Sequence, residues 1–492
     1  MSNSITKNNV SNDNKRKFLI FISLLIIVSS RFIPGPKGMS ASAMQVLGVL
    51  IGTLILWLTL SIDWPSLLGL AGLAFIPEIS FNGMIAGSIG SSTFSFLLFT
   101  FMCTYAISKT SFVKRTAVYF ITSNVARRGP WWFLTLYCFS VLLIGLVMSP
   151  AVLFVIYLPI MEEICNLLKL EKDDKLANAL IMGQTISCAL SSGMTPIAHV
   201  FGIMAMGFYE TATGQTINYA EYMGVGIPVG LIAFVGMMLI FKLFLKPDMS
   251  KFTDVDMNSL KEDIKPMNKR EITILSIFFV VIALWVLPGI FEPIMPNISN
   301  YINAKGTAFP PLLGAVALFL ITIDGKQLLD FKEVMSKGIS WGSIIMAAST
   351  LGIGAAMTNS EIGLTDWLTT SIGPALEGMS PIVLVIIFLV WASIQTNLSS
   401  NMVTITVVCA VAIPIALTSN GLISAPGIAV LIGMMGAFAF AAPPAHPNVA
   451  LAIGTGYTTT GQMLKYGSLM MVITVIAAAV VGYPLAVALM GY

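Results

Sequence analysis

The stretch Ala442-Pro443-Pro444-Ala445-His446-Pro447-Asn448 decides the interpretation of the fold, because Pro196-Ile197-Ala198-His199 repeats its core in the first half of the chain. These two histidines are the only ones in the sequence. A serine-bearing polar break precedes each of the two motifs, as Met148-Ser149-Pro150-Ala151 in the first half and Ser399-Ser400-Asn401-Met402 in the second. In both halves, therefore, a polar break between two apolar pieces is followed by a proline-rich break. This order predicts a two-fold internal repeat.

The composition of the 492-residue chain places it in a membrane. Apolar residues make up 56% of it and charged residues 10%, whereas average soluble domains carry roughly 25% charge. The formal net charge of +3 argues against nucleic acid as a partner. The five cysteines lie in apolar stretches, which is typical of small buried residues rather than of a disulfide framework or a metal site. We therefore expect an all-α polytopic membrane protein in a lipid bilayer.

Charge and hydropathy divide the chain into four parts. Four cations precede the first apolar run, which favours a cytoplasmic N-terminus. Several later apolar pieces are shorter than the roughly 17 residues that cross a bilayer, which indicates re-entrant hairpins and interrupted helices. The expected parts are a cytoplasmic N-terminus with the first membrane helix (1–43), a first inverted repeat (44–245; hairpin tip near 149, broken helix near 191–199), a cytoplasmic connector (246–271) and a second inverted repeat (272–492; hairpin tip near 400, broken helix near 442–447).

The residues at the four breaks are suited to a small anion. A helix that begins inside a membrane presents unpaired backbone N–H groups and roughly half an elementary positive charge at its N-terminus. The side chains there are small and neutral and include no Asp or Glu, which argues against an organic cation as cargo. The candidate substrate-binding residues are Ser149, Pro150, Ala151, Ser192, Gly193, Thr195, Pro196, His199, Ser400, Asn401, Met402, Pro443, Pro444, His446 and Pro447.

These segments resemble the divalent anion/sodium symporters, the INDY-type carriers of di- and tricarboxylates. Members of that family carry a Ser-Asn-Thr signature at a hairpin tip in each half, followed by a helix broken at a Gly-Thr-Pro-Pro or Ala-Thr-Pro-Pro segment. Here Ser400-Asn401-Met402 is similar to the second tip, and Ala442-Pro443-Pro444 looks like the second broken segment, with Gly454-Thr455-Gly456-Tyr457 after it. Gly193-Met194-Thr195-Pro196 resembles the first broken segment, while the first tip keeps only Ser149.

The resemblance implies a fold and a function. The fold has about eleven transmembrane helices plus two re-entrant hairpins, and the protein is a homodimer. A transport domain moves past a scaffold domain in an elevator mechanism. The implied substrates are C4 and C5 dicarboxylates such as succinate, malate, fumarate and 2-oxoglutarate, and no enzymatic activity is expected. An odd helix count with a cytoplasmic N-terminus places the C-terminus outside the plasma membrane.

One departure from the family pattern suggests exchange rather than symport. In sodium-coupled members the hairpin-tip asparagines help to hold sodium beside the dicarboxylate, but Pro150 takes that place at the first tip. We expect His199 and His446 to supply the positive charge or the N–H donors that sodium supplies elsewhere. The carrier is then a sodium-independent dicarboxylate exchanger without a cofactor or metal. A cationic empty site is costly to move through apolar surroundings, whereas a bound dianion neutralises it.

Several alternatives stay open from the sequence. A sodium-coupled dicarboxylate or citrate symporter would use Asn401 and backbone carbonyls, with sodium as the coupling ion. An intramembrane hydrolase would take Ser192 as nucleophile and His199 as base, but it leaves the second histidine and the second serine break without a role. A channel suits the paired hairpins less well than a closed central site. Gln184 and Gln395 either bridge helices or belong to the site.

The alignment of the two hairpin tips has two solutions. Pro159 follows Ser149 by ten residues, whereas Pro414 follows Ser400 by fourteen and Thr404 by ten. Either the second half contains an insertion of about one helical turn, or Thr404 is the equivalent of Ser149. The Ser400-Asn401 pair favours the insertion.

Overall fold

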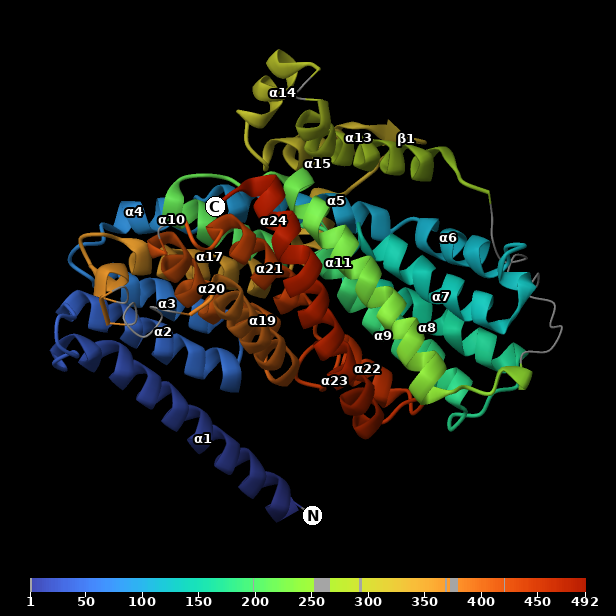
Figure 1. Ribbon diagram of the computed structural model, residues 1–492, viewed down its shortest axis with the longest axis horizontal. Coiled ribbons are helices and arrows are strands. Elements are labelled where there is room, and N and C mark those ends of the chain that lie inside the picture. Colours follow the sequence, from blue (N-terminus) through green and yellow to red (C-terminus); the bar gives the residue numbers. More distant parts are fainter. Residues whose placement is uncertain are drawn as a thin grey trace.

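Helices make up almost the whole of the chain that the structure describes, as the apolar runs predict (Figure 1). A short antiparallel ribbon of β1 (Thr322–Ile323) and β2 (Lys326–Gln327) is the only sheet in that part of the chain. The expected all-α class is confirmed. This computed structural model describes residues 2–197, 199–251, 266–291, 294–367, 370–371, 379–419 and 421–492.

Some helices of the first half begin at a side chain that accepts a hydrogen bond from a backbone N–H of the first turn. Others begin at a proline, which has no backbone N–H to satisfy. Ser40 accepts a hydrogen bond from the backbone N of Ala43, and Asn218 and Glu221 form a capping box. Pro130 and Pro150 occupy first helical positions, where no N–H is needed. The helices are α1 (Ser2–Ser29), η1 (Ser30–Phe32), α2 (Ala41–Thr59), α3 (Trp64–Ala74), α4 (Phe81–Gly87), α5 (Ser92–Ser108), α6 (Phe112–Ile121), η2 (Ala126–Arg128), α7 (Pro130–Gly145), α8 (Pro150–Leu167), α9 (Lys175–Met194), α10 (Val200–Thr213) and α11 (Tyr219–Ile240), which continues into η3 (Phe241–Leu245).

The second half begins after the connector expected at 246–271, of which residues 252–265 lie outside the described residues. Helices α13, α14 and α15 lie together with β1 at the top of the view in Figure 1. The helices are η4 (Met249–Lys251), α13 (Lys269–Phe291), α14 (Pro296–Asn303), α15 (Phe309–Leu320), α16 (Phe331–Glu333), η5 (Val334–Gly338), α17 (Trp341–Thr358), α19 (Pro381–Leu398), α20 (Asn401–Thr418), α21 (Ala425–Ala437), α22 (Pro447–Gly454), α23 (Thr460–Ala477), η6 (Ala478–Gly482) and α24 (Tyr483–Met490).

Eight helices in the described part of the chain are long and apolar enough to cross a membrane, and α4 with α5, bent by 45°, makes a possible ninth. Four shorter apolar helices, α3, α7, α15 and α21, accompany them. The protein is therefore a polytopic membrane protein. The eight are α2, α8, α11 with η3, α13, α17, α19, α20 and α23 with η6 and α24.

Both halves contain two neighbouring helices joined as a hairpin and, after them, a helix with a break. The hairpins are α7–α8 and α19–α20, and the broken helices are α9–α10 and α21–α22. Ser149 and Ser400 are the residues that precede α8 and α20. This places Ser400 rather than Thr404 at the position equivalent to Ser149. His199 and His446 likewise precede α10 and α22.

The first break is shorter than the expected range of 191–199. Residues 191–194 still belong to α9, and the hydroxyls of Ser191 and Ser192 donate to carbonyls of that helix, those of Cys188 and Ala189. The helix ends at Met194, and Thr195 after it is extended, as the residue before a proline usually is. The break therefore comprises Thr195 to His199, of which Ala198 lies outside the described residues.

Buried polar side chains tie the helices of the first repeat together. Gln184 on α9 accepts a hydrogen bond from the hydroxyl of Tyr137 at 2.6 Å and donates to the carbonyl of Phe154 at 2.9 Å. Gln184 thus bridges α7, α8 and α9 rather than reaching a ligand. All five cysteines are buried and free, as expected.

The two broken helices pack against each other. Helix α10 contacts both α20 and α21. A Cβ at Gly433 of α21 would lie 3.0 Å from the Cβ of Ala205 and 3.1 Å from the Cα of Gly202, both on α10. The close approach of these backbones brings the two breaks into one region of the molecule.

Candidate functional site

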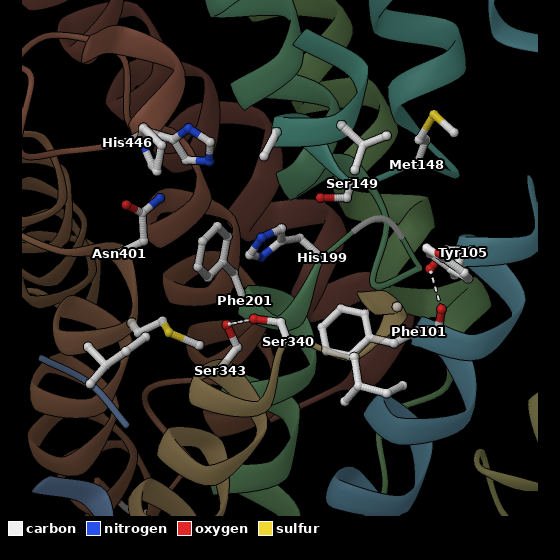
Figure 2. A pocket seen from close by; sticks show the side chains of 18 of the residues that line it. Phe101, Tyr105, Met148, Ser149, His199, Phe201, Ser340, Ser343, Asn401 and His446 are labelled. Carbon is white, nitrogen blue, oxygen red and sulfur yellow. Dashed lines mark hydrogen bonds between the residues drawn. The ribbon is translucent and has the colours of Figure 1, made fainter. Parts of the chain in front are cut away.

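The four helix starts of the repeat lie around one cavity of about 610 Å³. Ser149, Ser400, His199 and His446, which precede α8, α20, α10 and α22, all line it. Figure 2 shows three of them, Ser149, His199 and His446, around the same space. Each helix start contributes a partial positive charge of roughly half a unit. The cavity wall formed by these four ends is therefore electropositive although it contains no lysine or arginine.

Nine of the fifteen predicted residues line the cavity and six do not. The nine come from both hairpin tips and both breaks. The lining residues are Ser149, Ala151, His199, Ser400, Asn401, Met402, Pro444, His446 and Pro447, and those away from the cavity are Pro150, Ser192, Gly193, Thr195, Pro196 and Pro443.

Ser192 and Gly193 lie inside the packed end of α9. The Ser192 hydroxyl donates to Ala189, and the carbonyl of Gly193 accepts from the hydroxyl of Tyr222 at 3.1 Å. A Cβ at Gly193 would lie 2.6 Å from the ring of Phe438. Gly193 therefore allows the two broken helices to pack closely, and the Ser192 hydroxyl is engaged within α9 and does not line the cavity that His199 lines.

Pro150 and Thr195 connect different breaks to one another. The Thr195 hydroxyl donates to the carbonyl of Leu146 at the first hairpin tip, at 2.5 Å. The carbonyl of Pro150 accepts from the side-chain amide of Asn448 on α22, at 3.0 Å. Their polar atoms thus hold the tips and breaks in place. Pro196 does not line this cavity but lines a much smaller neighbouring one, with Ser149 and His199.

The second break is held by a residue that the sequence did not single out, Asn397 of α19. Its side-chain oxygen accepts from the backbone N of Phe440 and of Ala441, both at 2.9 Å. Its amide nitrogen donates to the carbonyls of Phe438 and Ser393, also at 2.9 Å. Because the side chain supplies the partners that a continuous helix would have supplied, α21 ends at Ala437 and the break begins earlier than the expected residue 442.

His446 acts as a hydrogen-bond acceptor toward its own helix. Its Nδ1 accepts from the backbone N of Asn448 at 3.1 Å, so that the imidazole caps α22. A ring nitrogen that accepts an N–H carries no proton, which leaves the proton on Nε2. The side chain is 7% exposed. In this arrangement His446 is a neutral Nε2–H donor at the cavity wall.

Other polar groups at the cavity have no partner among the described residues. Nδ1 of His199 is buried and unpaired, while its ring stacks on Phe201 with centroids 4.0 Å apart. Nδ2 of Asn401 is also unpaired, although the residue is only 4% exposed. The hydroxyls of Ser149 and Ser400 do not cap their helices. Since buried polar groups are normally hydrogen-bonded, these atoms indicate a cavity built for a polar ligand.

The residues on the opposite side of the cavity were not predicted from the sequence, because they belong to neither hairpin tip and to neither break. Tyr105 comes from α5 and Lys337 from η5, with Ser340 and Ser343 just beyond it. Figure 2 shows the hydroxyls of Ser340 and Ser343 linked to each other, at 2.7 Å. The one feature of the sequence that could have indicated this side of the cavity is Lys337, a lysine close to the start of an apolar run. Within the described part of the chain, no group of three or more His, Cys, Asp or Glu side chains is arranged to hold a metal ion.

Comparisons with known sequences give a consistent result. A profile of the sodium:sulfate symporter transmembrane region matches residues 14–491. A sodium-dependent dicarboxylate transporter, SdcS, of Staphylococcus saprophyticus is 25% identical over 64% of this chain and 60% of its own length. A citrate/succinate antiporter of Escherichia coli K12 is 23% identical over 66% of this chain and 64% of its own. The chain thus spans somewhat less than two thirds of the length of these two relatives.

Two further similarities cover most of the chain. A protein named as a putative malate transporter, YflS, of Bacillus subtilis is 21% identical over 95% of this chain and 96% of its own. Among solved structures, the YdaH transporter of Alcanivorax borkumensis superimposes with a TM-score of 0.57, covering 85% of this chain and 88% of that one at 11% identity. The second similarity concerns the fold alone.

Proposed function

Because the chain belongs to the family of the sodium:sulfate symporter transmembrane region, as the match over residues 14–491 shows, we propose that it carries C4 and C5 dicarboxylates across the plasma membrane. The family that the hairpin tips and breaks resemble is the one found, and it is a family of transporters rather than enzymes. Three relatives named as dicarboxylate, citrate/succinate and malate transporters support this substrate class.

The observation that carries the proposal is the arrangement of four helix starts around one cavity. Four N-terminal ends together supply roughly two positive charges, which matches the two negative charges of a dicarboxylate. The unpaired amide of Asn401 and the unpaired ring nitrogen of His199 add hydrogen-bonding groups from both halves. A dianion bound between the two halves has complementary partners at each end.

We further propose that transport is a sodium-independent exchange. Pro150 takes the place of the first-tip asparagine and has no side-chain oxygen to offer a sodium ion, and its carbonyl accepts a hydrogen bond from the side chain of Asn448. His199 and His446 lie at the two broken helices and line the cavity from opposite repeats. We assign to them the role of donors that hold the substrate where sodium does so in coupled carriers.

The mechanism that suits this arrangement is an elevator. The hairpins and broken helices are joined by Thr195, Asn397 and Asn448, so they move as one transport domain against the remaining helices as a scaffold. We propose a homodimer with a cytoplasmic N-terminus and an external C-terminus.

Exchange in proteoliposomes is the test of this proposal. Labelled succinate is expected to enter vesicles preloaded with unlabelled succinate at least about tenfold faster than empty vesicles, with potassium replacing sodium throughout. Protein-free vesicles and labelled acetate serve as controls. Entry into empty vesicles that follows a sodium gradient and gains nothing from internal dicarboxylate establishes a symporter instead. If no dicarboxylate, citrate or sulfate enters under either condition, the transport proposal is wrong.

A further inference from the structure

The side of the cavity that faces the four helix starts is formed by α5 and η5. We call it the α5–η5 wall, and its lining residues are Phe101, Thr104, Tyr105, Ser108, Lys337 and Gly338. Helix α5 packs against η5, and η5 follows α16 without a gap. These elements belong to neither hairpin nor to either broken helix. In an elevator they are part of the stationary scaffold.

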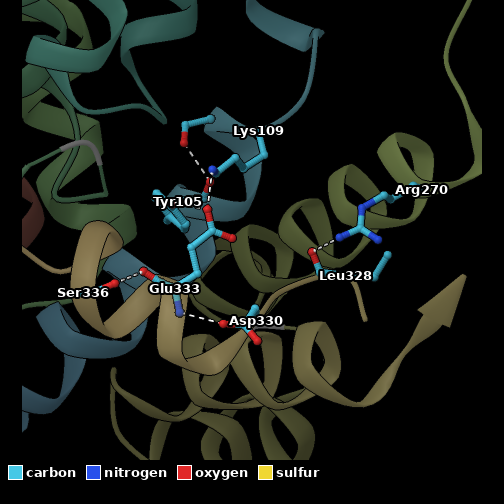
Figure 3. A network of polar contacts seen from close by, with 8 residues as sticks. Tyr105, Lys109, Arg270, Leu328, Asp330, Glu333 and Ser336 are labelled. Carbon is cyan, nitrogen blue, oxygen red and sulfur yellow. Dashed lines mark hydrogen bonds and ion pairs between the residues drawn. The ribbon is translucent and has the colours of Figure 1, made fainter. Parts of the chain in front are cut away.

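The wall is fixed by an ion pair at its outer edge (Figure 3). Nζ of Lys109 lies 2.7 Å from Oε1 of Glu333, and the hydroxyl of Tyr105 donates to the same oxygen at 3.0 Å. The hydrogen bond from Lys109 holds the pKa of the Glu333 carboxyl below its ordinary value. Asp330 caps the start of α16 by accepting from the backbone N of Glu333 at 2.7 Å. The α16–η5 segment is therefore docked on the end of α5.

A close packing contact fixes the same segment one turn later. A Cβ at Gly338 would lie 2.8 Å from Cγ of Tyr105 and 2.6 Å from Cγ2 of Val334. Only a residue without a side chain allows η5 to approach α5 in this way. Lys337 directly precedes Gly338, so its backbone is held at the cavity wall while its flexible side chain stays exposed.

Lys337 is the only lysine or arginine among the described residues that line the cavity. Glu333 lies one helical turn before it, the spacing at which a glutamate neutralises a lysine. However, Oε1 of Glu333 already accepts hydrogen bonds from Lys109 and Tyr105. Lys109, Glu333 and Lys337 together carry one net positive charge beside the cavity. Lys332 and Asp330, also on this segment, cancel each other.

The cavity extends from the molecular surface to the interior. Lys337, Ser340 and Pro444 are exposed, whereas Asn401 and His446 at the helix starts are buried. An anion that enters from the surface therefore passes Lys337 before it reaches the four helix ends. A positive charge at such an entrance raises the local concentration of anions and their rate of association.

We propose that Lys337 is a stationary cation that attracts the dicarboxylate into the cavity on one face of the membrane only. This inference rests on the proposed function and adds a specificity residue to it. Because Lys337 is fixed to α5, it stays behind when the transport domain carries the substrate away. Lys337 therefore affects substrate capture only on the side of the membrane to which the cavity opens in this structure. On the other side of the membrane, the transport domain binds substrate without Lys337.

The test compares Lys337→Gln with Lys332→Gln, which removes the same charge from the same segment but away from the cavity lining. Exchange is measured in right-side-out and inside-out vesicles at low and high salt. At low salt, Lys337→Gln is expected to raise the KM for succinate about five- to tenfold on one face and to leave the other face and the maximal rate within about twofold. High salt should shrink the difference, since screening weakens exposed charges.

Two further measurements make the outcomes decisive. Lys337→Arg keeps the charge and is expected to retain the wild-type KM, while the melting temperature of each variant reports whether it folds. An unchanged KM and salt dependence on both faces in Lys337→Gln overturns the inference and leaves the transport proposal intact. An equal rise on both faces shows that Lys337 moves with the substrate site, which also overturns it. If the wild-type protein moves no dicarboxylate, the transport proposal itself has failed.

Discussion

Replacing His446 with alanine is expected to lower dicarboxylate exchange at least about tenfold while the protein still inserts into the membrane. The imidazole caps α22 through Nδ1 and presents Nε2–H at the cavity wall. A hydrogen bond to a charged group contributes about 1.5–3 kcal/mol, and a loss of about 1.4 kcal/mol is already a factor of ten in binding. Exchange of labelled succinate between loaded proteoliposomes measures the effect.

The same loss is expected for His199→Ala, because His199 takes the equivalent place before α10 and its Nδ1 has no partner among the described residues. The control must separate loss of a helix cap from loss of a ligand contact. Thr459 caps α23 away from the cavity, and Thr459→Ala removes a cap of similar value, about 1 kcal/mol. That variant should exchange at the wild-type rate. His446→Asn keeps an acceptor and a donor and should recover part of the activity. Wild-type exchange in both alanine variants means that the histidines only pack.

The hairpins and breaks were predictable from sequence because they are encoded locally. A serine or histidine between two apolar pieces and a proline inside a break interrupt the apolar pattern of the chain wherever they occur. The occurrence of His199 and His446 at matching points in the two halves then reveals the repeat without any knowledge of contacts. Ser149 and Ser400 follow from the same comparison, and all four line the cavity.

The positions that the sequence predicted wrongly or did not predict depend on tertiary contacts. Ser192 and Gly193 are close to the first break in sequence, but the Ser192 hydroxyl donates within α9, and Gly193 packs against Tyr222 of α11 and against Phe438. Lys337 lies far from both breaks in sequence and reaches the cavity only because η5 docks on α5. The start of the second break is fixed by Asn397, which is distant from it in the chain. No local pattern encodes such contacts.

Asn397→Ala is expected to be the most destabilising single substitution considered for this fold. One side chain satisfies four backbone groups, those of Ser393, Phe438, Phe440 and Ala441. The residue is fully buried, so water cannot replace the lost partners. An unsatisfied buried group costs about 1–3 kcal/mol, and at least two of these groups lie in a break where no helix supplies another partner. We expect a loss of several kcal/mol, measured as a lower melting temperature and a lower yield of folded protein in detergent.

The neighbouring residue provides a matched control for this prediction. The hydroxyl of Thr396 is equally buried and donates a single hydrogen bond, to the carbonyl of Gly436 at 2.6 Å. Thr396→Ala should therefore cost about 1 kcal/mol. Asn397→Asp keeps the oxygen that accepts from Phe440 and Ala441 but loses the donors and buries a charge, so it should not restore stability. Equal melting temperatures for Asn397→Ala and Thr396→Ala contradict the assignment. In that case the break would be held by packing alone, and α22 with His446 would keep its position without the amide.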